Sequence, residues 1–312
     1  MANSINIILA TDKNYAQHAT VAMASVLLNT YTPKKIYFFV IDDNINADNK
    51  EKMLSSVNKL GGRLSFVTAN EKALEDVFVS GNLTRAAYLR LDIPNMVPFS
   101  VDRIIYIDCD LLVLSDIKQL WETDLNGKPL AATEDFGILS SSAKRAEKIK
   151  NLAWKREYSY FNSGVLLIDV KQWRESNNAK KLLKLAVTKS FRHHDQDVLN
   201  YLFMNNWVKL EAKWNVIPPI FNMPFRTVID SALRKRAIAA LKAPAILHYA
   251  GGYKPWEYES VIGFNDKYYE YLSYTEYCNV KMPQPNPKKK GHSLSRQLWR
   301  LKWARFISNI FG

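Results

Sequence analysis

Two aspartates, Asp108 and Asp110, stand one residue apart directly after a run of large apolar residues at positions 104–107. The run predicts a buried strand that is apolar on both faces. Because side chains two apart in an extended chain point the same way, both carboxylates are expected to face one point. Carboxylates brought together repel each other, and a hard divalent cation relieves that repulsion and can bridge a phosphate as well. The pair therefore predicts a metal site beyond the end of a strand, with a solvated turn as the alternative.

A second group of polar residues comes near the end of the main body of the chain. The apolar residues 245–247 lead into His248, which is followed by Gly251, Gly252 and Lys254. Glycines open the backbone, so that peptide N–H groups and a lysine ammonium can face the same anion. The stretch predicts a corner that binds phosphate and metal, and the alternative is a purely structural histidine at a strand end.

Asp12 and Asn14 follow the first apolar strand, residues 5–9. The turn after this strand lacks the Gly-x-Gly-x-x-Gly pattern of dinucleotide-binding folds, which argues against a nicotinamide or flavin enzyme. A carboxylate and an amide at this position can instead contact a base or a ribose of a mononucleotide. They are also common helix caps, and the sequence leaves both interpretations open.

Two further polar stretches lie beside predicted elements. Asn162, Ser163 and Gly164 precede a buried strand and predict either a close approach of the backbone to a ligand or a simple turn. His193 and His194 have no partner at metal-ligand spacing, and we expect them to form the solvated start of a helix.

The elements that must position these side chains alternate between strand and helix. Strands are predicted at residues 5–9, 35–41, 63–67 and 104–107, and helices at residues 16–29 and 46–60. Strands and helices of this length imply right-handed crossovers and a largely parallel sheet in an α/β fold. The polar, basic residues 137–150 predict either a mobile lid or an ordinary exposed helix.

The composition is that of a soluble globular protein, with 47% hydrophobic and 23% charged residues among 312. Two cysteines argue against a disulfide framework, and no apolar window is long enough to span a membrane. The N-terminus also lacks the features of a secretory signal, so we expect a cytoplasmic protein. The net charge of +13 is unevenly distributed, because residues 281–312 contain eight Lys or Arg and no acid.

This basic tail, residues 281–312, follows a proline-rich break. From Ser293 a helix is predicted in which Trp299, Trp303, Phe306 and Ile310 form one stripe flanked by basic residues. Tryptophans beside basic side chains suit an interfacial helix, so residues 288–311 are expected to bind an anionic membrane surface. The alternative is a stripe that packs on the protein itself. Because most of the net charge lies in the tail and the body is nearly neutral, no nucleic acid is expected as a partner.

Seven motifs in order along residues 5–256 resemble glycosyltransferase family 8, and within it the bacterial lipooligosaccharide and lipopolysaccharide α-galactosyltransferases. They are Ala10-x-Asp12-x-Asn14-Tyr15, Tyr88-Leu89-Arg90, the Asp108-Cys109-Asp110 stretch, Phe161-Asn162-Ser163-Gly164, Asp195-Gln196-Asp197, Trp214-Asn215 and His248-Tyr249-x-Gly251-x-x-Lys254. The resemblance implies a GT-A fold. It divides the chain into a transferase domain, residues 1–280, and the tail. Within the domain, residues 1–135 would bind the nucleotide and residues 136–280 the acceptor.

The resemblance also implies an activity, namely transfer of galactose or glucose from a UDP-hexose donor to a saccharide acceptor, with retention of configuration. The acceptor is expected to be lipid-linked, in the synthesis of lipopolysaccharide or another cell-surface glycan. Asp108, Asp110 and His248 would hold Mn²⁺, or Mg²⁺ in its place. The nucleotide sugar would be bound by Ala10, Asp12, Asn14, Tyr15, Arg90, Asp108, Cys109, Asp110, Asn162, Ser163, Asp195, Gln196, His248, Gly251 and Lys254.

The catalytic residues implied by the resemblance are Arg90, Asp135, Gln196 and Asp197. Retention usually requires a nucleophilic carboxylate, and Gln196 is a poor nucleophile, so Asp197 stays a candidate nucleophile and Gln196 a stabilising group. The chain departs from the family pattern at residues 82–85 and 137–150, which leaves the acceptor and the preferred donor open. The alternatives are a glycogenin-like self-glucosylating protein and a non-catalytic protein that binds membranes or nucleic acid.

Overall fold

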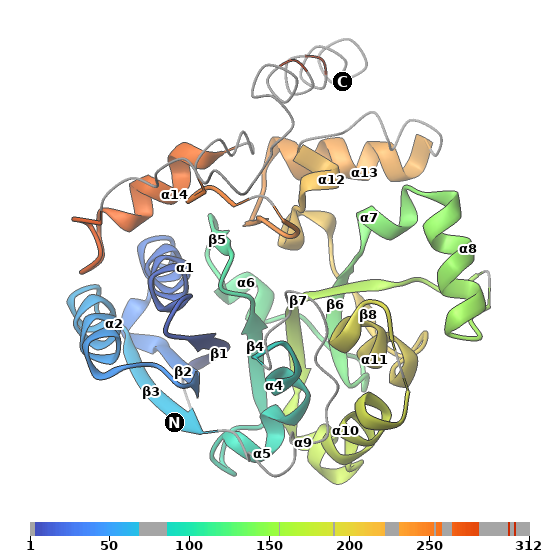
Figure 1. Ribbon diagram of the computed structural model, residues 1–312, viewed down its shortest axis with the longest axis horizontal. Coiled ribbons are helices and arrows are strands. Elements are labelled where there is room, and N and C mark those ends of the chain that lie inside the picture. Colours follow the sequence, from blue (N-terminus) through green and yellow to red (C-terminus); the bar gives the residue numbers. More distant parts are fainter. Residues whose placement is uncertain are drawn as a thin grey trace.

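A seven-stranded mixed sheet forms the centre of the protein, with the strand order β3-β2-β1-β4-β7-β6-β8 (Figure 1). This computed structural model describes residues 4–68, 86–155, 157–189, 191–221, 231–252, 254–257 and 264–280, together with Trp299 and Trp303. The strands are β1 (Ile5–Asp12), β2 (Ile36–Asp43), β3 (Arg63–Thr68), β4 (Arg103–Ile107), β6 (Leu130–Glu134), β7 (Phe161–Asp169) and β8 (Val208–Lys209). A second sheet pairs β5 (Leu111–Val113) with β9 (Ile246–His248).

The four strands predicted from the sequence are confirmed, and they run parallel to one another as β3, β2, β1 and β4. β7 runs antiparallel to both β4 and β6. The carboxyl end of β4 therefore meets the amino end of β7, where Asp108 N–H donates a hydrogen bond to the Gly164 carbonyl at 2.9 Å. This reversal brings the Asn162–Gly164 stretch beside the paired aspartates.

Helices cover both faces of the sheet. α1 (Ala16–Leu28), α2 (Ala47–Lys59) and α6 (Lys118–Trp121) lie on one face. The other face carries α4 (Ala86–Leu89), α5 (Ile93–Met96), α9 (Val170–Glu175), α10 (Asn178–Thr188) and α11 (His194–Leu202). Two further helices, α7 (Phe136–Leu139) and α8 (Ser142–Asn151), pack against each other. Alternate residues of β4 face opposite sides, as expected for a strand buried on both faces. Ile105 and Ile107 pack in the core beneath α1 and α2, whereas Ile104 and Tyr106 pack in the core formed with α9, α10 and α11.

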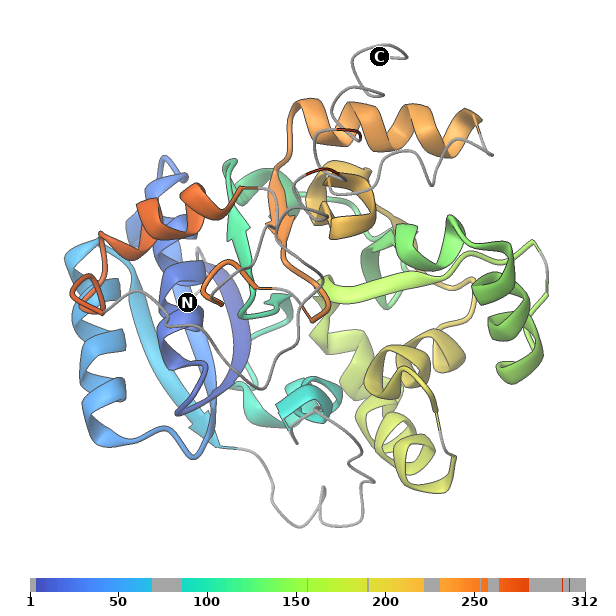
Figure 2. The same cartoon turned by 45° about the horizontal axis from the view of Figure 1, so that its top comes forward.

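A third core lies beyond the carboxyl end of β4 and contains α12 (Pro218–Phe221), α13 (Ser231–Lys242) and α14 (Asn265–Leu272). Figure 2 brings these helices forward over the sheet. α14 returns to the first helix of the chain, because the Tyr268 hydroxyl lies 2.6 Å from His18 Nδ1 and the Tyr271 hydroxyl accepts a hydrogen bond from Asn29. Helix α14, which comes late in the described residues, therefore packs against α1 near their start.

Of the two alternatives for residues 137–150, the structure supports a helix, since α7 and α8 occupy most of that range. The helix differs from an ordinary exposed one because Lys148 is 1% exposed. Among the described residues, no helix is both long and apolar enough to cross a membrane. The predictions for the tail lie outside the described residues except at Trp299 and Trp303, which are 59% and 46% exposed with ring centroids 5.6 Å apart. The departure at residues 82–85 also lies outside them.

Candidate active site

The two aspartates after β4 do face a common point, as the alternation of side chains predicts. Nε2 of His248 lies 3.2 Å from Oδ1 of Asp110 and 3.6 Å from Oδ2 of Asp108. The other oxygen of Asp108 accepts a hydrogen bond from the Tyr106 hydroxyl at 2.7 Å. Tyr106 stands two residues before Asp108 and so shares its face of the strand. This hydrogen bond fixes the rotation of the Asp108 carboxylate.

His248 reaches the aspartates because β9 pairs antiparallel with β5, with His248 opposite Leu111. Its Nδ1 atom lies 2.9 Å from Oδ1 of Asn215, which can only accept, so Nδ1 carries the proton. Nε2 then faces the two carboxylates. A second hydrogen bond of this kind is the usual support of a histidine that binds a metal.

The residues present fit a divalent cation. Asp108, Asp110 and His248 each offer one ligand atom, and the three atoms lie within 4.8 Å of one another. The backbone of β7 closes the site from below, because a Cβ added to Gly164 would lie 2.2 Å from Cε1 of His248 and 2.7 Å from Oδ2 of Asp108. The prediction that Asn162–Gly164 precede the strand is wrong, because they lie inside β7, which also excludes the simple turn. The backbone of Gly164 lies close to the His248 and Asp108 side chains, and its approach to a bound ligand stays a prediction. Two carboxylates and an imidazole suit Mn²⁺ or Mg²⁺.

Lys254 lies beside this cluster, at the same corner as His248, and is 8% exposed. Its ammonium donates hydrogen bonds to Oδ2 of Asp110 and, at 2.7 Å, to the Tyr249 carbonyl. Burial acts to raise the pKa of Asp110, yet the Lys254 ammonium holds that pKa well below its usual range. Gly251, in the same loop, has φ +97° and an open surround, so its peptide can approach a ligand closely.

Asp12 ends β1, and Asn14 and Tyr15 lie in the turn that leads into α1. Oδ1 of Asp12 accepts hydrogen bonds at 2.9 Å from the N–H groups of Asn14 and Tyr15, so it caps the turn into α1. The helix-cap alternative is not met, because the N-cap of α1 is Tyr15 and no side chain caps the helix. Oδ2 of Asp12 accepts from Nδ2 of Asn14 at 3.2 Å, and contact of Asp12 with a base or ribose stays a prediction. The Tyr15 ring is 38% exposed and lies edge-on to Trp256, with centroids 6.0 Å apart.

Cys109 and Ala10 contribute differently from the other predicted ligands. The thiol of Cys109 donates to the Ala10 carbonyl at 3.1 Å and is buried in the core beneath α1. Burial raises the pKa of this thiol, so it stays protonated. The Cys109 side chain therefore joins β4 to β1 and points away from the two aspartates that flank it.

Arg90 links the paired aspartates to the start of α11. Its guanidinium lies 2.9 Å from Oδ1 of Asp108 and 3.1 Å from Oδ2 of Asp195, and it also donates to the Ser163 carbonyl at 3.0 Å. The guanidinium also stacks over Tyr106, 4.5 Å from the ring centroid. Burial disfavours the charge, but the two carboxylates outweigh it and raise the pKa of Arg90. Arg90 is thereby a fixed cation between two anions.

Three hydrogen-bonded side chains, here called the Gln196 wall, form another part of the candidate site: Asp135, Asn162 and Gln196. Oδ2 of Asp135 accepts hydrogen bonds at 3.1 Å from Nε2 of Gln196 and from Nδ2 of Asn162. Oδ1 of Asn162 accepts from Nδ2 of Asn215 at 2.8 Å. A continuous chain of side-chain hydrogen bonds therefore runs from His248 to Gln196.

Asp197 follows Gln196 but has different surroundings, because successive residues of a helix point about 100° apart. It is 2% exposed and accepts hydrogen bonds from the Lys148 ammonium, from the Tyr160 hydroxyl at 2.6 Å and from the His193 N–H at 2.9 Å. Burial opposes its charge, yet these donors hold the pKa of Asp197 below its usual range. The sequence places Asp197 among the catalytic residues, and the structure places it behind Gln196.

The expectation that both histidines are solvated is wrong for His194. His193 is partly exposed, but His194 is 9% exposed and its Nδ1 lies 3.1 Å from the Tyr88 hydroxyl. A buried tyrosine supplies the partner that the sequence does not reveal.

Four residues that support the site were given no role from the sequence: Tyr106, Lys148, Tyr160 and Asn215. Tyr106 could have been found from its two-residue spacing to Asp108, and Asn215 belongs to a motif named for resemblance alone. Lys148 and Tyr160 carry no such signal, because their contact with Asp197 joins segments distant in sequence.

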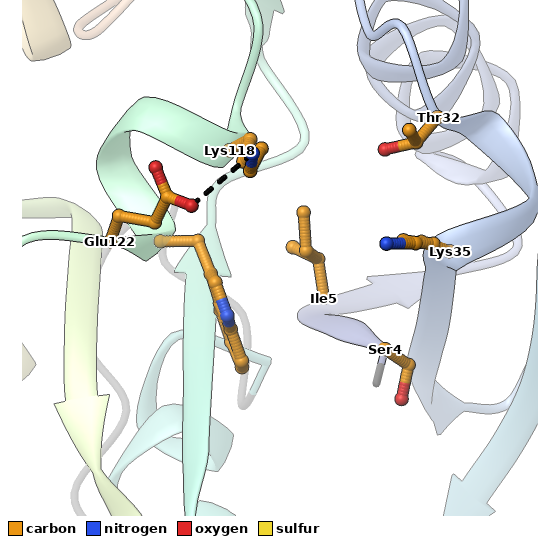
Figure 3. A pocket seen from close by; sticks show the side chains of 7 residues that line it. Ser4, Ile5, Thr32, Lys35, Lys118 and Glu122 are labelled. Atoms are coloured by element: carbon orange, nitrogen blue, oxygen red, sulfur yellow. Dashed lines mark ion pairs between the residues drawn. The ribbon is translucent and has the colours of Figure 1, made fainter. Parts of the chain in front are cut away.

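A separate hollow of about 220 Å³ lies near the start of β1 and β2 (Figure 3). Its lining is Ser4, Ile5, Thr32, Lys35, Lys118, Trp121 and Glu122, and Lys118 pairs with Glu122 at 3.4 Å. The hollow faces the amino ends of the parallel strands, whereas ligands of open α/β sheets bind beyond the carboxyl ends. The cluster around Asp108 is therefore the candidate active site.

Several known proteins are similar to this chain in sequence or in fold. The chain is 32% identical to general stress protein A of Bacillus subtilis over 287 residues, which cover 90% of this chain and 98% of that protein. It is 26% identical to lipopolysaccharide 1,2-glucosyltransferase of Escherichia coli K12 over 254 residues, covering 81% and 72% of the two chains. The crystal structure of the galactosyltransferase LgtC in complex with donor and acceptor sugar analogs superposes with a TM-score of 0.76. That match has 25% identity and covers 87% of this chain and 96% of that one.

The fold is thus the GT-A fold of LgtC, as predicted. Residues 6–260 match the profile of glycosyl transferase family 8, a range that includes every predicted site residue. The chain therefore belongs to glycosyl transferase family 8.

Proposed function

We propose that the protein is a Mn²⁺-dependent retaining hexosyltransferase that moves galactose or glucose from a UDP-hexose to a saccharide hydroxyl. The observation that carries this proposal is the convergence of Asp108, Asp110 and His248 within 4.8 Å, with Lys254 bound to Asp110. The names of two relatives support the reaction class, since one is a lipopolysaccharide glucosyltransferase and the other a galactosyltransferase bound to donor and acceptor sugar analogs.

The proposed roles follow from charge. A divalent cation held by the three ligands would neutralise the diphosphate of the donor as the bond to the sugar breaks. Lys254 supplies a second positive charge at the same edge, where its ammonium can stabilise charge that develops on the β-phosphate. Asp12, Asn14 and Tyr15, at the end of β1 and the turn into α1, would bind uridine and ribose.

The donor sugar would lie between Arg90 and the Gln196 wall. Arg90 is held by Asp108, Asp195 and the Ser163 carbonyl, so its guanidinium keeps one fixed position beside the proposed sugar site. The Gln196 amide is held by Asp135 and by the Ser163 N–H at 3.0 Å, which fixes it as a polar surface beneath the sugar. A preorganised site of this kind lowers the barrier without movement during the reaction.

The acceptor is proposed to be a lipid-linked saccharide at the inner face of the cell membrane, used in lipopolysaccharide or other surface-glycan synthesis. In this proposal the protein is cytoplasmic, residues 136–280 bind the acceptor, and residues 288–311 hold the enzyme at the membrane. The basic charge of the tail and the exposed Trp299 and Trp303 support this part.

The test is release of UDP from a panel of nucleotide sugars with Mn²⁺ or with a chelator. We expect Mn²⁺-dependent turnover of one UDP-hexose and a loss of about 100-fold or more in the Asp110→Ala variant. The matched control is Asp102→Ala, an exposed aspartate before the other end of β4. Absence of UDP release from every donor, with saccharide acceptors present, would contradict the proposal. A mass increase of the protein in steps of one hexose would instead indicate self-glucosylation.

A further inference from the structure

Lys148 is a buried cation on α8 that contacts Asp197 near the start of α11. The side chains of Lys148 and Asp197 are 2% and 3% exposed, and the ammonium donates to Oδ1 of the carboxylate. Lysine is almost never buried this completely unless it is paired. The lysine also lies 5.1 Å from the centre of the Tyr160 ring and 2.6 Å from Nδ1 of His193. The contact therefore fixes α8 against the segment that carries Gln196.

Both oxygens of Asp197 are occupied. Oδ1 accepts from Lys148 and from the Tyr160 hydroxyl at 2.6 Å, and Oδ2 accepts from the His193 N–H at 2.9 Å. A carboxylate that attacks a sugar must bring a free oxygen within about 3–3.5 Å of the anomeric carbon. Asp197 would have to give up at least one charge-assisted hydrogen bond in a buried site to do so.

Tyr160 connects Asp197 to Gln196 in the proposed donor site. Its hydroxyl donates to Asp197 and accepts a hydrogen bond from Nε2 of Gln196 at 3.2 Å. Burial raises the pKa of Tyr160, so the phenol keeps its proton and remains a donor to the carboxylate. Gln196 is thereby held by Tyr160 on one side and by Asp135 and Ser163 on the other.

We propose that Lys148 is a positioning residue for hexosyl transfer, and that Asp197 serves as its buried counter-ion and orders Gln196 through Tyr160 instead of attacking the donor sugar. The proposal rests on the function proposed above.

The experiment compares the full chain with Lys148→Met, Lys148→Arg and the control Lys150→Met, which changes an exposed lysine on the same helix. Turnover and KM for the UDP-hexose are measured below the melting temperature, and UDP affinity is measured by calorimetry. We expect Lys148→Met to lose about 100-fold in kcat, because a small displacement of Gln196 is felt at the reacting centre. KM and UDP affinity should stay within about threefold, because the nucleotide is bound at the other edge. Lys148→Arg should recover most of the loss.

If Lys148→Met does not fold, the double variant with Asp197→Asn replaces it, because removing both charges avoids an unpaired buried carboxylate. It should fold and show the same loss of kcat. A folded variant without Lys148 that keeps kcat within about twofold of the wild type overturns the proposal. So does a hexose bound covalently to Asp197 in quenched wild-type enzyme, detected by peptide mass spectrometry. A wild type that releases no UDP from any donor instead overturns the proposed function itself.

Discussion

Nδ1 of His248 lies 2.9 Å from Oδ1 of Asn215. A series of hydrogen bonds that begins at a backbone N–H group determines how the Asn215 amide is oriented. The Gly164 N–H can only donate, and it donates to Oδ1 of Asn162 at 3.0 Å. That oxygen also accepts from Nδ2 of Asn215 at 2.8 Å, which turns Oδ1 of Asn215 toward the imidazole. The Gly164 N–H thus acts through Asn162 and Asn215 to keep a proton on Nδ1 of His248, so that Nε2 faces the proposed metal site.

The Asn215→Ala variant should bind Mn²⁺ about 10- to 100-fold more weakly, because the imidazole loses the acceptor that fixes its tautomer and rotation. The measurement is calorimetric titration of Mn²⁺ into the purified protein. Asn206→Ala, at an exposed asparagine after α11, is the control and should bind as the wild type does. Equal affinity of the two variants would show that Asn215 does not support the ligand.

Gly164→Ala should abolish Mn²⁺ binding at the cluster while the protein stays folded. An added Cβ would lie 2.2 Å from Cε1 of His248 and 2.7 Å from Oδ2 of Asp108, so these side chains must move apart. Gly252→Ala is the matched control, because its Cβ would meet nothing within 4 Å and Gly252 has no positive φ. The check is Mn²⁺ titration of both variants, with circular dichroism to confirm folding. Retained binding in Gly164→Ala would rule out ligation by these residues.

The part of the site that sequence reasoning predicts is the part set by local geometry. The apolar run before Asp108 and the two-residue spacing to Asp110 place both carboxylates on one face, and the structure agrees. The contact of these carboxylates with His248 follows from the pairing of β5 with β9, in which Leu111 lies opposite His248, a residue far along the chain. A single sequence does not fix such a pairing, and the family resemblance supplied it instead.

The part that sequence reasoning missed depends on burial of polar residues. Lys148 lies in a helix whose composition is typical of a solvated one, and the structure buries it because Asp197 and Tyr160 provide partners. His194 is similar, since Tyr88 provides the buried partner that makes a solvated position unnecessary. In both cases the partner comes from another element, which no local pattern reveals.

Removal of the buried cation Arg90 should be far more costly than removal of an exposed one. Arg90→Ala leaves the buried Asp195 and the partly buried Asp108 without their shared partner, and we expect a loss of about 3–5 kcal/mol in the free energy of unfolding. Arg192→Ala removes an ion pair with Glu147 in which the arginine is 68% exposed, and it should cost at most about 1 kcal/mol. Urea denaturation of both variants measures the difference. Similar losses would mean that the Arg90 pair is well solvated.

Stability should fall as the pH drops below the ordinary pKa of histidine, because His18 is neutral in the folded protein. Burial lowers the pKa of His18 from 6.5 to about 3, and the imidazole stacks on Trp256 with ring centroids 3.6 Å apart. Gln17 donates to the Tyr268 hydroxyl at 3.0 Å, so that hydroxyl is free to donate to Nδ1 of His18, which must be unprotonated to accept it. The imidazole of His18 therefore binds a proton more readily in the unfolded chain than in the folded protein.

The sign follows from linkage, since a folded pKa below the unfolded value gives stability above pH 6.5 that is lost as the pH falls toward 3. Between pH 7 and pH 5 the contribution of His18 is a loss of about 2 kcal/mol. In His18→Gln, which has no ring to protonate and can still pair with Tyr268, this loss should disappear. Urea denaturation of both proteins at the two pH values tests this. If the pH dependence is the same with and without His18, the imidazole is protonated in the folded protein and the stacking on Trp256 does not exclude its charge.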